Sequence, residues 1–155
     1  MKNWISNEFV LLETDIDDLN PQLYGRVMER LYEHGNAIDV ALIPAFMKKN
    51  RPGVLLSVLC AQNRYEDCLA IIFAETSTLG VRKQLVECIG LPKEIIWVAT
   101  SLGRVRVKVV NILGQVRYHP EYEDCNKLAE ELKMPLVDVI KVIERDITSN
   151  LGSIE

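Results

Sequence analysis

The chain has 155 residues, of which 48% are hydrophobic and 26% are charged, and its net charge is −4. A chain of this size can bury a hydrophobic core as one domain, or as one domain with a small appendage. The acidic balance argues against a general nucleic-acid binder, and no apolar stretch is long enough to span a membrane. The first residues lack the core of a signal peptide, so we predict a cytoplasmic location.

Hydrophobic patterning in the first half of the chain predicts strands and helices in a recognisable order. Pro21 favours the start of the first helix and Gly35 favours its end, while Pro52 and Gly53 predict the turn of a hairpin. The predicted elements are strand, helix, strand, strand, helix and strand, over residues 9–14, 21–34, 38–47, 54–61, 64–75 and 81–88. This βαββαβ order is that of the ferredoxin-like fold.

The second half predicts a separate unit of one β-hairpin and two helices, over residues 94–100, 104–110, 120–133 and 135–150. In the second strand, valines alternate with Arg104, Arg106 and Lys108, so one face should be buried and the other basic. The basic face is either solvated strand surface or the lining of an anion channel. We therefore predict an α+β protein, with a ferredoxin-like unit at residues 1–90 and a hairpin-plus-helices unit at residues 91–155.

The last predicted helix carries more apolar residues than one packing partner covers. Its apolar positions are Leu136, Val137, Val139, Ile140, Val142, Ile143, Ile147 and Leu151. An apolar surplus on a terminal helix often marks a subunit interface. We expect a homo-oligomer, a trimer or a hexamer, and the alternative is a monomer whose final helix packs on an open sheet face.

Four carboxylates lie within six residues between the first predicted strand and the first helix. They belong to Glu13, Asp15, Asp17 and Asp18. Carboxylates at the end of a strand are suited to a hard divalent cation, which prefers oxygen ligands. The alternative is capping of the following helix, whose dipole favours negative charge, but capping accounts for only one or two of the four residues.

Two further polar segments have the chemistry of an anion site. The predicted hairpin turn holds Lys48, Lys49 and Arg51, which suit phosphate groups, although cations also decorate strand ends. The segment at residues 75–82 offers three hydroxyls, one glycine and one guanidinium, although its glycine is also typical of a helix end. Together with the carboxylates, these segments have the parts of a metal–polyphosphate site.

The cysteines do not predict a metal centre. Cys60, Cys68, Cys88 and Cys125 lack close CxxC spacing, and free cysteines in apolar strands and helices usually pack in the core. Cys125 follows two acidic residues, so nickel ligation is an alternative for this thiol.

Acidic residues and tyrosines gather where the third helix begins. Glu121, Glu123 and Asp124 are favoured in a first helical turn by the dipole. Tyr118 and Tyr122 are candidates for stacking on a base, with a neighbouring carboxylate to read the exocyclic amine of that base.

Four strings of this sequence resemble the C-terminal domain of the nickel insertion protein LarC family. They read LETDIDDLNPQ, MKKNRPG, ETSTLGVR and YHPEYEDC and occupy residues 12–22, 47–53, 75–82 and 118–125. The resemblance therefore covers nearly the whole chain. A full-length family member also carries an N-terminal domain, which we expect as a partner that is missing from this sequence.

The resemblance implies a CTP-dependent nickel chelatase. Such a protein inserts nickel into pyridinium-3,5-bisthiocarboxylic acid mononucleotide and cleaves CTP to CMP and pyrophosphate. It also implies Mg²⁺ or Mn²⁺ as the partner of CTP, and Glu13, Asp17 and Asp18 as the residues that hold this ion. The isolated domain is expected to depend on the missing N-terminal domain for activity.

The resemblance also implies which residues bind the phosphates. The implied phosphate-binding residues are Lys48, Lys49, Arg51, Thr76, Ser77, Thr78 and Arg82. Lys49, Arg51 and Asp17 would be catalytic, because positioned cations and metal ligands stabilise charge in phosphoryl transfer.

Two other classes of function stay open on the sequence. The chain could be a regulatory domain that binds CTP and metal without chemistry, or an assembly platform whose charged clusters form intersubunit salt bridges. Of the polar clusters in the predicted site, we expect the basic hairpin tip to lie far from the carboxylates. A neighbouring subunit would then bring its own hairpin tip to complete the site.

Overall fold

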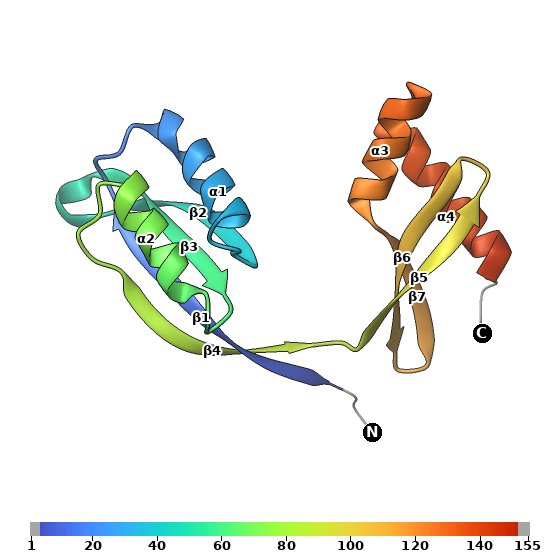
Figure 1. The fold of residues 1–155 in the computed structure, drawn as a ribbon, viewed down its shortest axis with the longest axis horizontal. Coiled ribbons are helices and arrows are strands. Elements are labelled where there is room, and N and C mark those ends of the chain that lie inside the picture. The colour runs from blue at the N-terminus through green and yellow to red at the C-terminus, as the bar shows by residue number, and fades with distance from the viewer. Residues whose placement is uncertain (1–3, 152–155) are drawn as a thin grey trace. The chain divides into compact units, whose positions relative to one another are not determined.

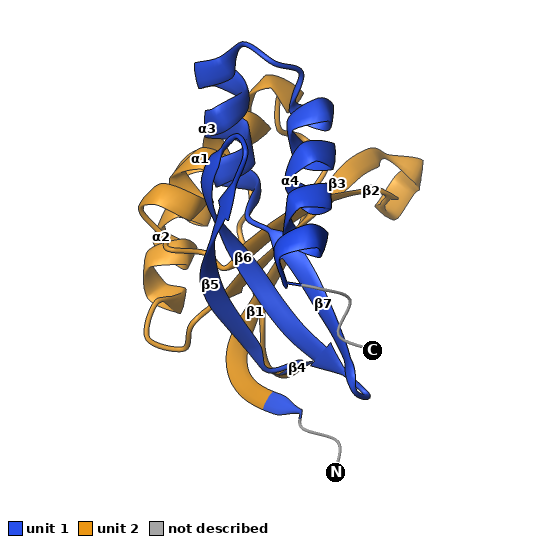
Figure 2. Ribbon diagram, turned by 90° about the vertical axis from the view of Figure 1, so that its right-hand side faces the viewer, with its two compact units in different colours: residues 1–5, 89–155 blue, residues 6–88 orange. Residues whose placement is uncertain are grey.

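The structure is a computed structural model that describes residues 4–151. The chain divides into two compact units (Figure 2). Residues 6–88 form one unit, and residues 89–151 form the other together with the short segment 4–5. Each unit has its own sheet and its own buried core.

The unit at residues 6–88 is a four-stranded sheet with two helices on one face (Figure 1). Its elements are β1 (Ile5–Ile16), a 3₁₀ turn (Pro21–Leu23), α1 (Tyr24–Glu33), β2 (Asp39–Phe46), a second 3₁₀ turn (Lys48–Asn50), β3 (Pro52–Cys60), α2 (Tyr65–Glu75) and β4 (Arg82–Gly90). The strand order is β2-β3-β1-β4. The predicted ferredoxin-like core is confirmed.

Alternation along the strands explains how this sheet buries one face. On β1, Val10, Leu12, Thr14 and Ile16 are buried, and the residues between them are not. Side chains from both helices complete the core, with Val27, Leu31, Cys68, Ile71 and Ile72 among them. The other face of the sheet therefore carries the odd-numbered residues of β1.

The unit at residues 89–151 is a three-stranded sheet with two helices. Its elements are β5 (Lys93–Thr100), β6 (Gly103–Ile112), β7 (Gln115–Pro120), α3 (Tyr122–Leu132) and α4 (Leu136–Leu151). The strand order is β5-β6-β7. Sequence analysis predicted β5 and β6 but not β7, because this strand has only six residues and ends at a proline.

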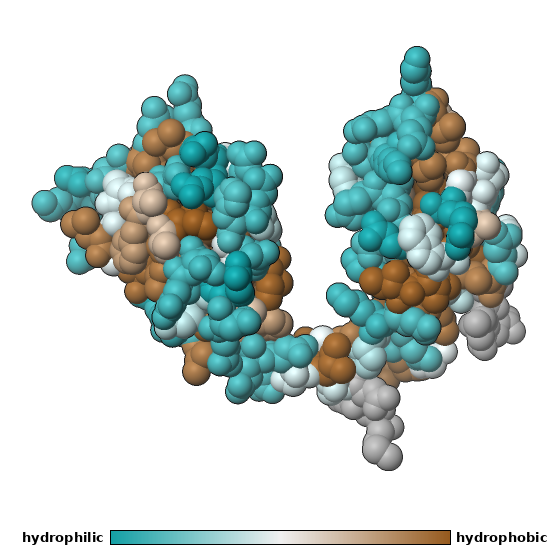
Figure 3. Space-filling view, viewed as in Figure 1, coloured by the Kyte–Doolittle hydropathy of each residue, from teal (hydrophilic) through white to brown (hydrophobic). Residues whose placement is uncertain are grey.

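The final helix uses most of its apolar stripe inside its own unit. Val139, Ile143 and Ile147 are buried in the core, whereas Val137 is 57% exposed. The surplus that suggested a subunit interface is therefore smaller than the sequence indicated. Hydrophobic residues are still visible between hydrophilic ones on each unit (Figure 3), and no helix within residues 4–151 has the length and apolar character of a membrane span.

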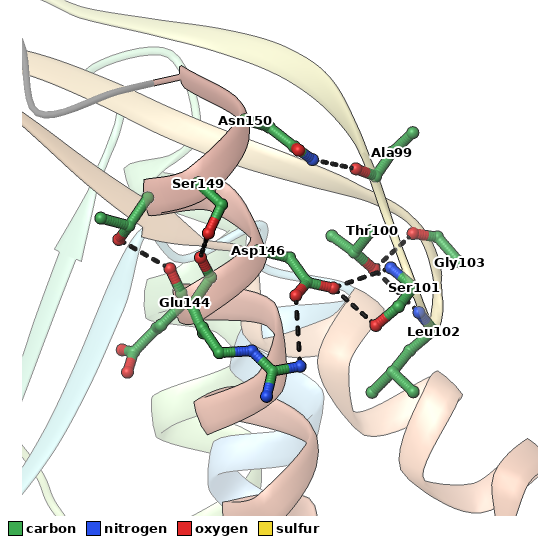
Figure 4. Close-up of polar contacts among 11 residues, drawn as sticks. Ala99, Thr100, Ser101, Leu102, Gly103, Glu144, Asp146, Ser149 and Asn150 are labelled. Carbon is green, nitrogen blue, oxygen red and sulfur yellow. Dashed lines mark hydrogen bonds and ion pairs between the residues drawn. The ribbon is translucent and has the colours of Figure 1, made fainter.

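Asp146 on α4 holds the turn between β5 and β6 (Figure 4). Its Oδ2 accepts hydrogen bonds from the backbone N–H and the hydroxyl of Ser101 at 2.8 and 2.6 Å. Asn150, one turn further along α4, donates to the carbonyl of Ala99 at 2.9 Å. These bonds attach the helix to the sheet by its polar edge, beside the buried stripe.

Asp146→Asn should destabilise the unit at residues 89–151 at neutral pH, because an amide oxygen accepts these bonds less strongly than a carboxylate. The hydrogen bonds from Ser101 lower the pKa of Asp146 below its ordinary value of 3.8. A lowered pKa stabilises the folded state above the unfolded-state pKa, and this stabilisation is lost as pH falls through the folded-state value. Thermal denaturation should therefore give the Asp146→Asn variant a lower Tm than the parent chain at neutral pH. The difference in Tm between the two proteins should shrink below pH 3.8.

Asp138→Asn is the matched control, because within residues 4–151 the one ion pair of Asp138 is an exposed contact with Lys141 at 3.7 Å on the same helix. An equal loss of Tm in the two variants would contradict the anchoring role of Asp146.

Candidate functional site

Three polar segments meet at one end of the sheet in the unit at residues 6–88. They are the end of β1, the β2–β3 loop at residues 47–51 and the α2–β4 loop at residues 76–81. The antiparallel register explains the first meeting, because Ile16 at the end of β1 pairs with Val54 near the start of β3. The strand order places β4 on the other side of β1, so the α2–β4 loop arrives at the same end.

Asp15 near the end of β1 is held by Arg82, the first residue of β4. The two terminal nitrogens of Arg82 donate to the two carboxylate oxygens of Asp15 at 2.7 and 3.4 Å. This donation lowers the pKa of Asp15 below its ordinary value, so the carboxylate stays charged. Both side chains are half exposed, so the pair contributes little to stability and can exchange partners.

The basic hairpin loop lies beside the acidic strand end within the same chain. Nη1 of Arg51 lies 3.4 Å from Oδ2 of Asp17, and an open cleft of about 350 Å³ is lined by Asp15, Asp17, Met47 and Lys48. The expectation that the hairpin tip would be distant from the carboxylates is wrong, so no neighbouring subunit is needed to bring it there. The reason is that β3 runs back along β1, so the loop that precedes β3 ends beside the carboxylates.

The β2–β3 loop has a defined backbone. The N–H of Met47 donates to the carbonyl of Arg51 at 2.8 Å, which closes the loop. Lys49 and Asn50 have φ values of 61° and 58°. This left-handed conformation suits asparagine but costs a lysine about 1 kcal/mol. The loop therefore holds Lys49 in a strained and exposed position next to the cleft, and Lys48 lines the cleft itself.

Gly53 lets the loop approach β1 closely. A Cβ at this position would lie 2.6 Å from the carbonyl oxygen of Ile16 and 2.8 Å from the sulfur of Met47. The first distance is to backbone, which cannot move aside as a side chain can. Any larger residue would therefore push the basic loop away from the carboxylates.

The α2–β4 loop is tied to β1 through hydroxyl groups. Oγ1 of Thr14 donates to the carbonyl of Gly80 at 2.8 Å and lies 2.5 Å from Oγ1 of Thr78. The hydroxyl of Ser77 donates to Asp18. Sequence analysis missed Thr14, which is 2% exposed. The signal for it was a polar residue in the buried register of an otherwise apolar strand.

The start of the same loop is fixed by α1 and α2. The hydroxyl of Thr76 donates to the carbonyl of Ile72 at 2.7 Å. Glu75 accepts hydrogen bonds from Arg30 and Arg26 of α1, and the bond from Arg30 is the main cause that lowers the pKa of Glu75. The hydroxyls expected to donate to phosphate therefore already order the loop, and contact with an anion would require them to exchange partners.

The predicted metal ligands do not form a ready-made set. Within residues 4–151, no three His, Cys, Asp or Glu side chains gather closely enough to hold a metal ion. Glu13 lies further back on β1, Asp18 is bound by Ser77, and Asp17 contacts Arg51. Mg²⁺ commonly binds through one or two carboxylates together with phosphate oxygens and water. The donors present therefore fit a metal that arrives with a polyphosphate.

The residues expected to read a base lie in the unit at residues 89–151. Tyr118 is partly buried against the core of that unit, whereas Tyr122 is 61% exposed and stays a candidate for stacking. Glu121 and Asp124 accept hydrogen bonds from two cations of β6. Cys125 is buried in the same core, and burial raises the pKa of its thiol, which disfavours a thiolate ligand.

Comparison with known proteins identifies the family. A family profile described as nickel insertion protein matches residues 1–140. The chain belongs to the nickel insertion protein family. It is 46% identical over 145 residues to a putative nickel insertion protein of Dictyoglomus thermophilum. It is 47% identical over 146 residues to a pyridinium-3,5-bisthiocarboxylic acid mononucleotide nickel insertion protein of Acetivibrio thermocellus.

The chain spans little more than a third of the length of these family members. Each alignment covers 94% of this chain, but only 37% of the first relative and 36% of the second. The similarity is therefore to one part of a longer protein.

Solved structures agree with this assignment. The fold is similar to LarC2, described as the C-terminal domain of a cyclometallase involved in the synthesis of the NPN cofactor of lactate racemase, with a TM-score of 0.82 and 31% identity. The match covers 92% of this chain and 99% of LarC2. Protein MK0293 of Methanopyrus kandleri matches with a TM-score of 0.61 at 22% identity, which shows the shared fold alone. The resemblance predicted from the sequence is confirmed.

Thr14→Val should loosen the α2–β4 loop, because valine has the shape of threonine but cannot donate to Gly80. Loss of one buried hydrogen bond should lower the free energy of unfolding by about 1–2 kcal/mol. Hydrogen exchange should also become faster at residues 76–81. Thr14→Ser is the control, since it keeps the hydroxyl and loses a methyl group. If serine loosened the loop as much as valine, the hydrogen bond would not be what orders it.

Proposed function

We propose that this domain binds CTP with Mg²⁺ or Mn²⁺ and takes part in nickel insertion into pyridinium-3,5-bisthiocarboxylic acid mononucleotide. The observation that carries the proposal is the meeting of carboxylates, a basic loop and a hydroxyl loop at one sheet end of a nickel insertion family member. Because the chain spans about a third of its relatives, insertion by the whole protein also depends on segments that are not present here.

The basic loop supplies the positive charge for the triphosphate in this proposal. Lys48 lines the cleft beside Asp15 and Asp17, and Arg51 contacts Asp17. A bound triphosphate competes for Arg51 and Arg82, because a phosphate group accepts a bidentate guanidinium as well as a carboxylate does. Lys49, in its strained position, adds a positive charge that would stabilise the leaving pyrophosphate.

The divalent ion is assigned to Asp17, which Arg51 would then release, and to Asp18, which now accepts a hydrogen bond from Ser77. Asp17 and Asp18 would hold Mg²⁺ or Mn²⁺ from the protein side, with Glu13 as a more remote support, and the ion would neutralise charge on the phosphates. Attack of a water molecule would form a new P–O bond at the α-phosphorus, break the bond from this phosphorus to the bridging oxygen, and release CMP, pyrophosphate and a proton. Lys49 and Arg51 would stabilise the charge that develops on this leaving group.

The nucleotide-sensing alternative predicts binding without cleavage. Incubation of the chain with CTP and Mn²⁺, followed by chromatography for CMP and pyrophosphate, separates the two functions. Product formation that Asp17→Asn abolishes would support catalysis. Binding without product, even after addition of the N-terminal domain of a relative, would favour sensing.

Lys49→Ala and Arg51→Ala should each weaken CTP binding about tenfold in the presence of Mg²⁺, since each removes one cation from the phosphate path. Isothermal titration calorimetry measures this directly, and the fold should persist because both side chains are exposed. Asn50→Gly is a control within the same loop, because it keeps the charge and suits φ 58°. Unchanged affinity in Lys49→Ala and Arg51→Ala would remove the basic loop from the site.

Oligomerisation to a trimer or a hexamer is part of the proposal, but shared sites are no longer expected. The carboxylates and the basic loop meet within one chain. A mixture of Lys49→Ala and Asp17→Ala chains should therefore bind no more CTP than the two variants measured apart. Recovery of binding in the mixture would show that subunits complete one another's sites, and light scattering on the parent chain reports the oligomeric state.

A further inference from the structure

The outer face of the sheet in residues 89–151 carries an exposed tryptophan among cations. The opposite face is buried under α3 and α4 through the valines of β5 and β6. Alternation therefore turns Arg104, Arg106 and Lys108 of β6 to the outer face. Trp97 of β5 pairs with Arg106 across the ladder, so its ring lies on the same face.

The tryptophan ring is held by cation–π contacts, and the side chain is still largely exposed. Trp97 is 57% exposed. The guanidinium carbons of Arg104 and Arg106 lie 5.5 and 5.9 Å from the ring centroid, at the range of cation–π contacts. A large aromatic side chain held in place by its neighbours and left open to water is typical of a stacking platform.

The uncompensated charge beside this ring comes from one arginine. Asp124 binds Arg106 through its Nε, Nη2 and backbone N–H at 2.9, 2.7 and 2.8 Å. Glu121 accepts a hydrogen bond from Lys108 at 3.0 Å. Arg104, in contrast, makes no ion pair with another residue in the described range 4–151. Next to the ring, the described residues of this face therefore offer a fixed aromatic surface, a neutralised support and one cation without an ion-pair partner, Arg104.

We infer that this face binds an anionic mononucleotide, whose planar ring stacks on Trp97 and whose phosphate or carboxylate group binds Arg104. Stacking on tryptophan accepts any planar ring, and a pyridinium ring gains from the electron-rich indole face. Proteins that bind single-stranded nucleic acid stack successive bases on several aromatic side chains. Among the described residues of this face, Trp97 is the one large aromatic side chain, which favours one ring.

The natural ligand, but not the existence of the platform, rests on the proposed function. Pyridinium-3,5-bisthiocarboxylic acid mononucleotide combines a flat cationic ring with thiocarboxylate and phosphate anions. Its chemistry fits an indole face next to a free guanidinium. The site at Trp97 would then hold this mononucleotide, which accepts the nickel. The cleft at Asp15 and Asp17 would hold the nucleoside triphosphate CTP.

Titration with nicotinic acid mononucleotide tests the inference, because this molecule is a pyridinium carboxylate with a phosphate. Trp4→Phe in the intact chain leaves Trp97 as the remaining tryptophan, since the sequence contains two. Saturable quenching of Trp97 fluorescence is expected, and Arg104→Gln should weaken the binding about tenfold. Ribose 5-phosphate, which lacks the ring, should bind much more weakly.

Arg117→Gln is the matched control for charge. Arg117 pairs with Val110, so it lies on the same face, but it is six residues along the ladder from Arg104, roughly 20 Å away. A mononucleotide at Trp97 should not sense this change. Equal weakening by both arginine variants, ribose 5-phosphate binding as tightly as the mononucleotide, or an absence of saturable quenching would each overturn the inference. So would tighter binding of an oligothymidylate that depends on both arginines, which would instead mark a nucleic-acid surface.

Two cross-controls separate this inference from the proposed function. Arg104→Gln should leave CTP binding with Mg²⁺ unchanged, and Arg51→Ala should leave the quenching of Trp97 unchanged. Loss of CTP binding in the parent chain with intact quenching would refute the triphosphate site and leave the platform standing. The reverse result would overturn the platform alone.

Discussion

The end of β1 collects negative charge that no single neighbour can balance. Asp15, Asp17 and Asp18 follow one another too closely for their carboxylates to avoid repulsion. Hydrogen-bond donors from three separate segments contact these carboxylates. They are Arg82 from β4, Arg51 from the β2–β3 loop and Ser77 from the α2–β4 loop. Charge at this point is therefore balanced by three segments that lie far apart in the sequence.

Each of these contacts is weak alone, which suits a site that exchanges partners. The arginines are more than half exposed in both ion pairs, and exposed pairs contribute about 0–1 kcal/mol. The stable part lies beneath them, where Thr14, Gly80 and the buried side chains of β1 hold the backbone. Rigid backbone with replaceable side-chain partners is a suitable preorganisation for an anionic ligand.

Periodicity predicted most of the fold, because each long element buries one continuous stripe. The ferredoxin-like order followed from apolar runs and from Pro21 and Gly35 at helix ends. Strand β7 was missed because six residues with three partly buried positions leave too short a pattern. The position of the basic loop was also missed, since sequence reasoning placed the strands in order but did not follow the register that sets Val54 beside Ile16. The role of Thr14 was not predicted, because its hydroxyl finds its partners, Thr78 and Gly80, only in the folded structure.

The close approach of Gly53 to β1 has a consequence for how the family can change over evolutionary time. Side chains alternate along a strand, so one residue inserted or deleted before β3 would turn the following side chains to the opposite face. The contact between Gly53 and the carbonyl of Ile16 leaves no slack to absorb such a change. Length variation among relatives should therefore be absent from the β2–β3 connection. It should collect instead in turns such as Leu113 and Gly114, where the chain is exposed and a Cβ at the glycine would meet nothing within 4 Å.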